Sequence, residues 1–278
     1  ALSVYPEYFK INGKWVLAAQ SRMDTVCVAN DTPGEESVDI VEFRNLKKGD
    51  KVVIGRTEDA SEGIYVWTQG FLEGDAHQDT FAFRAGRSRE TAFSIDYDNL
   101  YEVLKHEKAN GGYVTLIVGA ALSLDRDSRK ALERLVRNGY VNAIFCGTET
   151  AAFDLEKGIY GTTWGQEKFE KEQNTTKNLY KTINLARKYG STKALVESGL
   201  VKDGFMKACV EMDVPVVIAG TIRDRLGLPE TINNVYAAQN EMRKHARKTS
   251  TIIMMGAILY TIATGNMTPS YNVFDGVV

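Results

Sequence analysis

Two polar clusters directly follow strongly apolar segments of the chain, and their side chains are of types that perform acid–base or anion-binding chemistry. The first cluster starts at Gly147 and contains Thr148, Glu149, Asp154 and Glu156. A carboxylate can hold an amino group or move a proton, and a threonine hydroxyl can donate a hydrogen bond to a phosphate or a ribose. Acidic residues also favour the first turn of a helix, where they complement the helix dipole. For Asp154 and Glu156 the sequence leaves both interpretations open.

The second cluster starts at Gly220 and contains Thr221, Arg223 and Asp224. The planar guanidinium of Arg223 suits a carboxylate or a phosphate, and Asp224 could bind an ammonium group or move a proton. The alternative is a surface ion pair in a loop, which stabilises a protein little. The functional interpretation is favoured because this polar loop directly follows an apolar strand.

Both clusters lie where apolar strands alternate with amphipathic helices. The sequence predicts strands over residues 113–118, 141–146, 214–219 and 251–255, and helices over residues 98–110, 127–138, 203–212 and 231–248. Such alternation predicts crossover units on a parallel sheet, and unbroken apolar strands are typical of a sheet covered on both faces. The predicted fold class is α/β, with a Rossmann-like parallel sheet.

The first 90 residues have a different pattern, with β-rich runs separated by polar turns. These runs cover residues 14–20, 24–30, 38–43, 50–55 and 63–71. Their spacing predicts a small antiparallel sheet or barrel. We therefore expect a β-rich N-terminal subdomain over residues 1–90, followed by a Rossmann-like domain over residues 91–278.

Four glycines each end a predicted strand of the parallel sheet, namely Gly119, Gly147, Gly220 and Gly256. Ligands of open parallel sheets bind at the carboxyl ends of the strands, and glycine lets the backbone approach a phosphate closely. A single glycine could equally serve a tight turn, but four together favour a ligand site. No G-x-G-x-x-G or P-loop motif is present, so a dinucleotide would bind through other loops.

Composition excludes several classes of function. The chain has 34 Lys and Arg against 36 Asp and Glu, so it has no basic excess with which to bind nucleic acid. Three histidines (His77, His106 and His245) and three cysteines (Cys27, Cys146 and Cys209) are widely scattered. This spacing predicts neither a disulfide framework nor a metal site.

The longest apolar run, residues 252–263, is too short to span a bilayer and is expected to be a buried core segment. The first residues lack the pattern of a signal peptide. We therefore expect no membrane partner and a cytoplasmic location.

Three segments carry a family resemblance. Residues 139–165, GYVNAIFCGTETAAFDLEKGIYGTTWG, resemble a segment typically written GYVDALLAGNALAVHDIEAALYGTSLG. Residues 219–243 contain IRD-x-x-x-LPE, and residues 252–270 contain IATGN-x-x-PS. With weaker similarity upstream, residues 45–270 resemble the LOR/SDH conserved-domain family. That family includes archaeal NAD-dependent ornithine cyclodeaminases and the C-terminal part of cyanobacterial arginine dihydrolase–ornithine cyclodeaminase enzymes.

The resemblance implies a bound NAD that removes a hydride from ornithine and later returns it, so that proline and ammonia form. The cofactor performs the hydride chemistry and the protein supplies orientation and charge. Family positions and strand ends give these expected NAD contacts: Gly119, Gly147, Thr148, Gly220, Thr221, Gly265 and Asn266. Arg223 and Asp224 match the family's IRD, and Asp154 and Glu156 match its HDIE. An amino-acid substrate and a homo-oligomer are implied as well.

Several family histidines are replaced in this chain. Phe153 and Tyr260 stand where the family has histidine, and Thr148 and Glu149 stand in place of Asn-Ala. Because histidine is the usual proton carrier near neutral pH, the substrate or outcome is expected to differ, with Glu149 and Tyr260 as catalytic candidates. The alternatives are an NAD-binding dehydrogenase or group-transfer enzyme of the same fold, and a non-catalytic ligand-binding relative.

Overall fold

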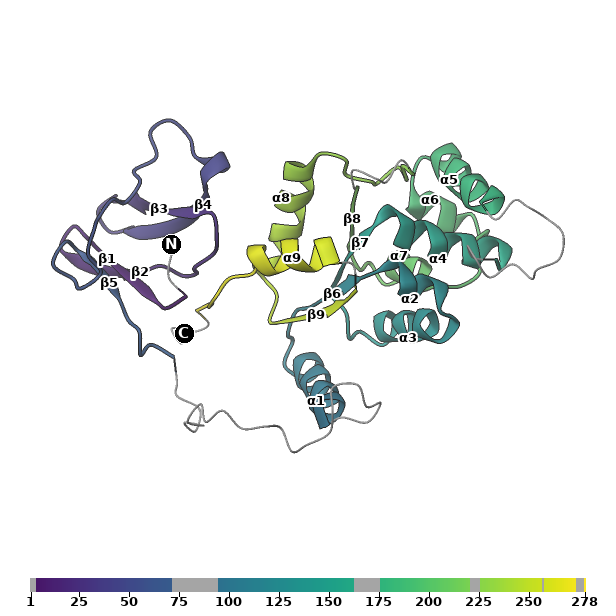
Figure 1. The fold of residues 1–278 in the computed structure, drawn as a ribbon, viewed down its shortest axis with the longest axis horizontal. Helices are drawn as coiled ribbons and strands as arrows, with labels where there is room; N and C mark the ends of the chain where they lie inside the picture. The colour runs from purple at the N-terminus through teal and green to yellow at the C-terminus, as the bar shows by residue number, and fades with distance from the viewer. Residues whose placement is uncertain (1–3, 72–94, 163–175, 221–225, 257, 274–277) are drawn as a thin grey trace. The chain divides into compact units, whose positions relative to one another are not determined.

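The computed structural model describes residues 4–71, 95–162, 176–220, 226–256, 258–273 and 278. The chain divides into two compact units (Figure 1). One contains Ala1–Gly86 together with Asn266–Val278, and the other contains Arg87–Gly265. The domain boundary near residue 90 stays a prediction.

In the part of the N-terminal unit that the structure describes there are two small antiparallel sheets, which confirms the expected β region. One has the strand order β2-β1-β5 and the other is the pair β3-β4. The strands are β1 (Glu7–Ile11), β2 (Lys14–Leu17), β3 (Thr25–Asn30), β4 (Ser37–Glu42) and β5 (Ile64–Val66), and the 3-10 helix η1 (Phe43–Asn45) follows β4. Their buried side chains, among them Phe9, Cys27 and Ile40, form a separate small core.

Two details of this unit differ from the sequence-based expectation. The expected strand over residues 50–55 makes only an isolated bridge, between Val52 and Val28. In contrast, β1 is a strand that the pattern did not predict. Its buried residues are Glu7, Phe9 and Ile11, and the charged Glu7 hides the apolar alternation that would have revealed it.

The end of the chain packs within the N-terminal unit. Asn272 forms a bridge with Gln20, and the Ser270 amide donates a 2.8 Å hydrogen bond to the Ser21 carbonyl oxygen. The buried Tyr271 hydroxyl donates to the Ala18 carbonyl oxygen over 2.8 Å. These contacts tie residues 270–272 to a segment some 250 positions earlier.

The second unit is an α/β fold built on a four-stranded parallel sheet, which confirms the predicted class. Its strands lie in the order β8-β7-β6-β9, with bounds β6 (Val114–Val118), β7 (Ala143–Gly147), β8 (Val216–Ala219) and β9 (Thr251–Met255). Val118 of β6 lies opposite Cys146 of β7, and Gly147 of β7 lies opposite Ala219 of β8. The two central strands are fully buried, as their apolar sequences predict.

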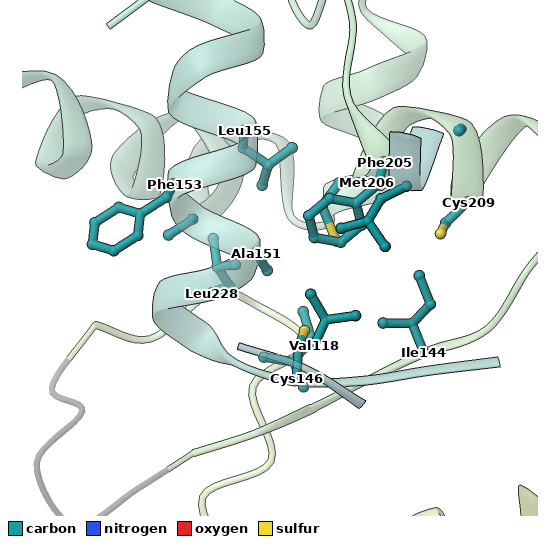
Figure 2. Close-up of a cluster of buried hydrophobic side chains, with 14 of the residues drawn as sticks. Val118, Ile144, Cys146, Ala151, Phe153, Leu155, Phe205, Met206, Cys209 and Leu228 are labelled. Carbon is teal, nitrogen blue, oxygen red and sulfur yellow. The ribbon is translucent and has the colours of Figure 1, made fainter. Parts of the chain in front are cut away.

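Helices cover both faces of this sheet, with α2 to α7 on one face and α8 on the other (Figure 1). The bounds are α1 (Ile95–Ala109), α2 (Ala120–Leu124), α3 (Arg126–Arg137), α4 (Thr148–Tyr160), α5 (Lys177–Tyr189), α6 (Thr192–Glu197), α7 (Phe205–Glu211), α8 (Val235–Ala246) and α9 (Ile258–Met267). Figure 2 shows the core between sheet and helices, where Val118 and Ile144 face Leu155 of α4 and Phe205 of α7. Within the described ranges, no helix is long and apolar enough to cross a membrane.

The apolar run over residues 252–263 is not a buried core segment, so that expectation is wrong. The run is divided between β9 and α9, and the side chains of Met254 and Ile262 are 39% and 56% exposed. The physical reason is position, because β9 is an edge strand of the sheet. An apolar sequence alone does not distinguish an edge strand from a central one.

We expect His245 of α8 to make the stability of the second unit pH-dependent. The Tyr113 hydroxyl lies 2.7 Å from His245 Nδ1, and the two rings stack. Burial lowers the pKa of His245 below its ordinary value of 6.5. The unfolded chain therefore takes up this proton first, and the free energy of unfolding should fall as the pH falls through about 6.5.

Urea unfolding at about pH 7.5 and about pH 5.5 measures this effect. We expect a smaller decline in the His245→Gln variant than in the unchanged protein. His106→Gln, at an exposed position on α1, is the matched control and should retain the full decline. Equal declines in the unchanged protein and in His245→Gln would contradict the assignment.

Candidate functional site

The carboxyl ends of β6 and β9 form the topological switch point of the sheet. From β6 the chain proceeds through β7 and β8 to one side, whereas β9 lies on the other side of β6. The Gly119 amide, just after β6, donates a 3.0 Å hydrogen bond to the Met255 carbonyl oxygen at the end of β9. A Cβ built on Gly256 would lie 3.8 Å from the Gly119 Cα. Ligands of open α/β sheets bind in the crevice at such a point.

Tyr260 of α9 lies against the carboxyl ends of β7 and β8. Its hydroxyl donates a 2.8 Å hydrogen bond to the carbonyl oxygen of Ala219, the last residue of β8. A Cβ added to Gly147, the last residue of β7, would come within 2.8 Å of the same hydroxyl oxygen. The structure therefore brings together two of the predicted site residues, Gly147 and Tyr260.

Thr148 joins the end of β7 to the segment that follows β8. It is the first residue of α4 and is fully buried. Its hydroxyl lies 3.2 Å from the hydroxyl of Thr231. The N-cap residue of α4 is Gly147, which provides no side-chain cap, so the first backbone N–H groups of this helix are suited to an anion.

Gly220 is enclosed by the segment that contains Thr231. Its amide donates a 2.9 Å hydrogen bond to the Ile232 carbonyl oxygen, and a Cβ there would meet Asn233 Oδ1 at 2.6 Å. The sequence pattern missed these neighbours because it predicted a helix from residue 231. The helix α8 starts at Val235, after Asn234, whose side chain caps it through the Ala237 amide. The available signal was Asn233-Asn234, since asparagine is a preferred N-cap residue.

Asp154 is completely buried and makes contacts internal to the fold. Its Oδ1 forms an ion pair with Arg129 Nε at 2.5 Å, and its Oδ2 accepts a 2.9 Å hydrogen bond from the Met206 amide. Burial raises the pKa of the Asp154 carboxyl to about 6, while Arg129 and the backbone donors oppose that rise. The carboxyl is paired with the Arg129 guanidinium, and it joins α3, α4 and the start of α7.

Glu156 is also fully buried. Its Oε1 accepts a 3.1 Å hydrogen bond from the Thr162 hydroxyl, which in turn accepts one from the Asn178 amide group of α5. This chain of contacts connects α4 to α5. The contacts of Asp154 and Glu156 give no support to their catalytic assignments, which stay predictions.

Glu149 is exposed in the first turn of α4. Its carboxylate makes no hydrogen bond or ion pair with another described residue. It lies two residues after Gly147, so it is the carboxylate of the first cluster that solvent and a ligand can reach.

Gly265 and Asn266 are exposed residues within α9. The helix continues through both residues to Met267 and ends shortly before Pro269. A Cβ on Gly265 would meet nothing within 4 Å. Their roles as NAD contacts stay predictions. Thr221, Arg223 and Asp224 lie outside the described residues.

The described residues contain no group of three His, Cys, Asp or Glu side chains that could hold a metal ion. In the same ranges, all three cysteines are buried free thiols. Burial raises the pKa of the Cys146 thiol to about 12, so it is not a thiolate at neutral pH.

Comparison with known proteins identifies the family. Residues 98–274 match the family model of the Rossmann-fold part of the C-terminal region of ArgZ-like arginine dihydrolases, and residues 6–90 match the model of the first part of that region. The chain belongs to the ArgZ-like C-terminal family. This result confirms the resemblance inferred from the three sequence segments and the Rossmann-like fold.

Similar curated proteins of this family come from archaea and cyanobacteria. The ornithine cyclodeaminase of Methanocaldococcus jannaschii is 31% identical over 95% of this chain and 62% of that protein. The bifunctional arginine dihydrolase/ornithine cyclodeaminase AgrE of a Nostoc species is 30% identical over 96% of this chain and 38% of that protein. The chain thus spans less than two thirds of these relatives.

Solved structures of the family have the same fold. A LOR/SDH protein of Methanococcus maripaludis matches with a TM-score of 0.82 and 29% identity, over 98% of this chain and 80% of that one. The complex of AgrE with ornithine and NAD+ matches with a TM-score of 0.59 and 28% identity, over 99% of this chain and 37% of that one.

Proposed function

We propose that this ArgZ-like chain is an NAD-dependent enzyme that acts on an amino or diamino acid, with ornithine as the first candidate. The observation that carries the proposal is the switch point, where Gly119 at the end of β6 and Gly256 at the end of β9 lie side by side. Two similar proteins support the proposal, namely the relative named ornithine cyclodeaminase and AgrE, which was solved in complex with ornithine and NAD+. The differences at Phe153 and Tyr260 lead us to propose an altered substrate or outcome.

The residues at the carboxyl edge fit a dinucleotide. The segment at Gly119, at the end of β6, would lie against the pyrophosphate, and the first turn of α4 with the buried Thr148 hydroxyl would face the ribose over β7. When bound, NAD would supply reversible hydride transfer. Arg223 would bind the substrate carboxylate, and Asp224 would hold the amino group or move its proton.

The remaining candidates have supporting roles in this proposal. Tyr260 would position the ends of β7 and β8 through its bond to Ala219. Asp154 and Glu156 would hold α4 in place through Arg129 and Thr162. Three buried free thiols fit a reducing cytoplasm. Homo-oligomer formation is proposed from the family resemblance.

A non-catalytic ligand-binding protein is the second candidate. Phe153 is buried and has no group that titrates, and Tyr260 is engaged by a backbone oxygen. Neither can replace the neutral-pH chemistry of the histidines found at these family positions. A dehydrogenase or group-transfer enzyme of the same fold would also retain the NAD site.

Incubation of the full chain with NAD+ and isotope-labelled L-ornithine tests these candidates. We expect NAD+ binding by calorimetry and product formation by mass spectrometry from L-ornithine or from another amino acid of a tested set. Proline and ammonia in equal amounts from L-ornithine, without accumulation of NADH, would show that the substrate and the outcome are not altered. Accumulating NADH would indicate a dehydrogenase, and binding of NAD+ without any product from a set of amino acids would indicate the non-catalytic protein. Absence of NAD+ binding would contradict the proposed function.

A further inference from the structure

Glu149 differs from the other carboxylates of α4 in being available to a ligand. Asp154 is paired with Arg129 and backbone amides, and Glu156 accepts from Thr162. The Glu149 side chain is exposed in the first turn of the helix, next to Thr148, whose position is set by its contact with Thr231. Its backbone is thus held firmly while its carboxylate remains accessible.

The order of the strands determines which part of a dinucleotide Glu149 would meet. The switch point lies between β6 and β9, and β7 lies on the other side of β6. A dinucleotide whose pyrophosphate crosses at the end of β6 has one ribose over β9 and the other over β7. Because Gly147 ends β7 and Glu149 follows two residues later, a ribose over β7 comes within reach of this carboxylate.

We propose that Glu149 accepts hydrogen bonds from the vicinal hydroxyls of the adenosine ribose and so makes the site selective for NAD over NADP. The inference rests on the proposed NAD-dependent function. A carboxylate is an acceptor only, so it suits two hydroxyl donors. A 2′-phosphate would bring two like charges against it, at a distance where like charges repel strongly.

This carboxylate is a particular feature of the chain. The family segment quoted above has alanine at the position of Glu149, so the selectivity is expected to differ from that of relatives with the alanine. The alternative role for Glu149 is complementing the helix dipole. Asp127 has that role at an exposed site in the first turn of α3, and it therefore provides a matched control.

Calorimetry with NAD+ and with NADP+ on the full chain tests the inference. We expect the unchanged protein to bind NAD+ at least 100-fold more tightly than NADP+. In Glu149→Ser this ratio should fall at least tenfold, through weaker NAD+ binding and tighter NADP+ binding. In Glu149→Gln, which retains an acceptor but loses the charge, NADP+ binding should tighten while NAD+ binding changes less than threefold. Asp127→Asn should leave the ratio unchanged.

An unchanged ratio in Glu149→Ser, with NAD+ still bound, would overturn this inference and leave the proposed function intact. Equal affinities of the unchanged protein for NAD+ and NADP+ would overturn it as well. If neither nucleotide binds the unchanged protein, the proposed function fails and this inference fails with it. Thermal unfolding of each variant distinguishes the outcomes from misfolding, since Glu149→Ser and Asp127→Asn should shift Tm by similar small amounts.

Discussion

Replacing Asp154 by asparagine is expected to lower the free energy of unfolding by about 3–5 kcal/mol, the usual effect of breaking a buried ion pair from one side. The carboxyl is fully buried, and Arg129 lies 2.5 Å from it with its own side chain only 7% exposed. The substitution would leave the Arg129 guanidinium in a low-dielectric interior beside a neutral amide. It would also weaken the acceptor for the amides of Phe205 and Met206 at the start of α7.

Urea unfolding followed by circular dichroism measures this change. Asp203→Asn is the matched control, because Asp203 binds the same guanidinium with its side chain 59% exposed. It should cost less than about 1 kcal/mol, as exposed ion pairs do. The double variant Arg129→Met with Asp154→Leu should recover much of the stability, since apolar residues can replace a buried pair. Unchanged stability with lost product formation would instead make Asp154 a catalytic residue.

Replacing Arg223 by methionine is expected to raise the KM for the amino-acid substrate about 10- to 100-fold. Hydrogen bonds to charged groups contribute about 1.5–3 kcal/mol, and an Arg–carboxylate pair is often bidentate. Methionine retains an unbranched apolar side chain but removes every donor. Because Arg223 is proposed to bind substrate rather than cofactor, the Kd for NAD+ should change less than about twofold.

Arg225→Met is the matched control for this prediction, since it removes an equal charge two residues further along. Steady-state kinetics and calorimetry on both variants separate the roles. Equal increases in KM in the two variants would show that only the local charge matters. A weakened Kd for NAD+ in Arg223→Met would assign this arginine to a cofactor phosphate instead.

Local patterns were sufficient for most of the second unit. The apolar runs that became β6 and β7 were predicted within one or two residues, because a strand buried on both faces must be apolar throughout. Helix α3 was similarly predictable, since Leu132 and Val136 are buried one turn apart. The position of Gly119 at the end of β6 was also available from sequence alone. These features depend on neighbours a few residues away.

Local sequence patterns did not predict the roles of the three carboxylates of α4. Asp154, Glu156 and Glu149 share one short helix and one residue class, yet two are buried and one is exposed. The partner that neutralises Asp154 is 25 residues upstream, and the amide that it caps is 52 residues downstream. No local pattern contains contacts of that separation.

The sequence by itself therefore determined the class of fold, the family and the strand ends at which a ligand is expected, because these follow from short-range periodicity and contiguous motifs. Only the tertiary structure decided that β9 is an exposed edge strand, that Tyr260 lies against Gly147 and Ala219, and that Asp154 is an internal ion-pair partner. The physical reason is common to all three. Burial, charge pairing and close approach are properties of groups that meet only after crossover connections bring distant segments together.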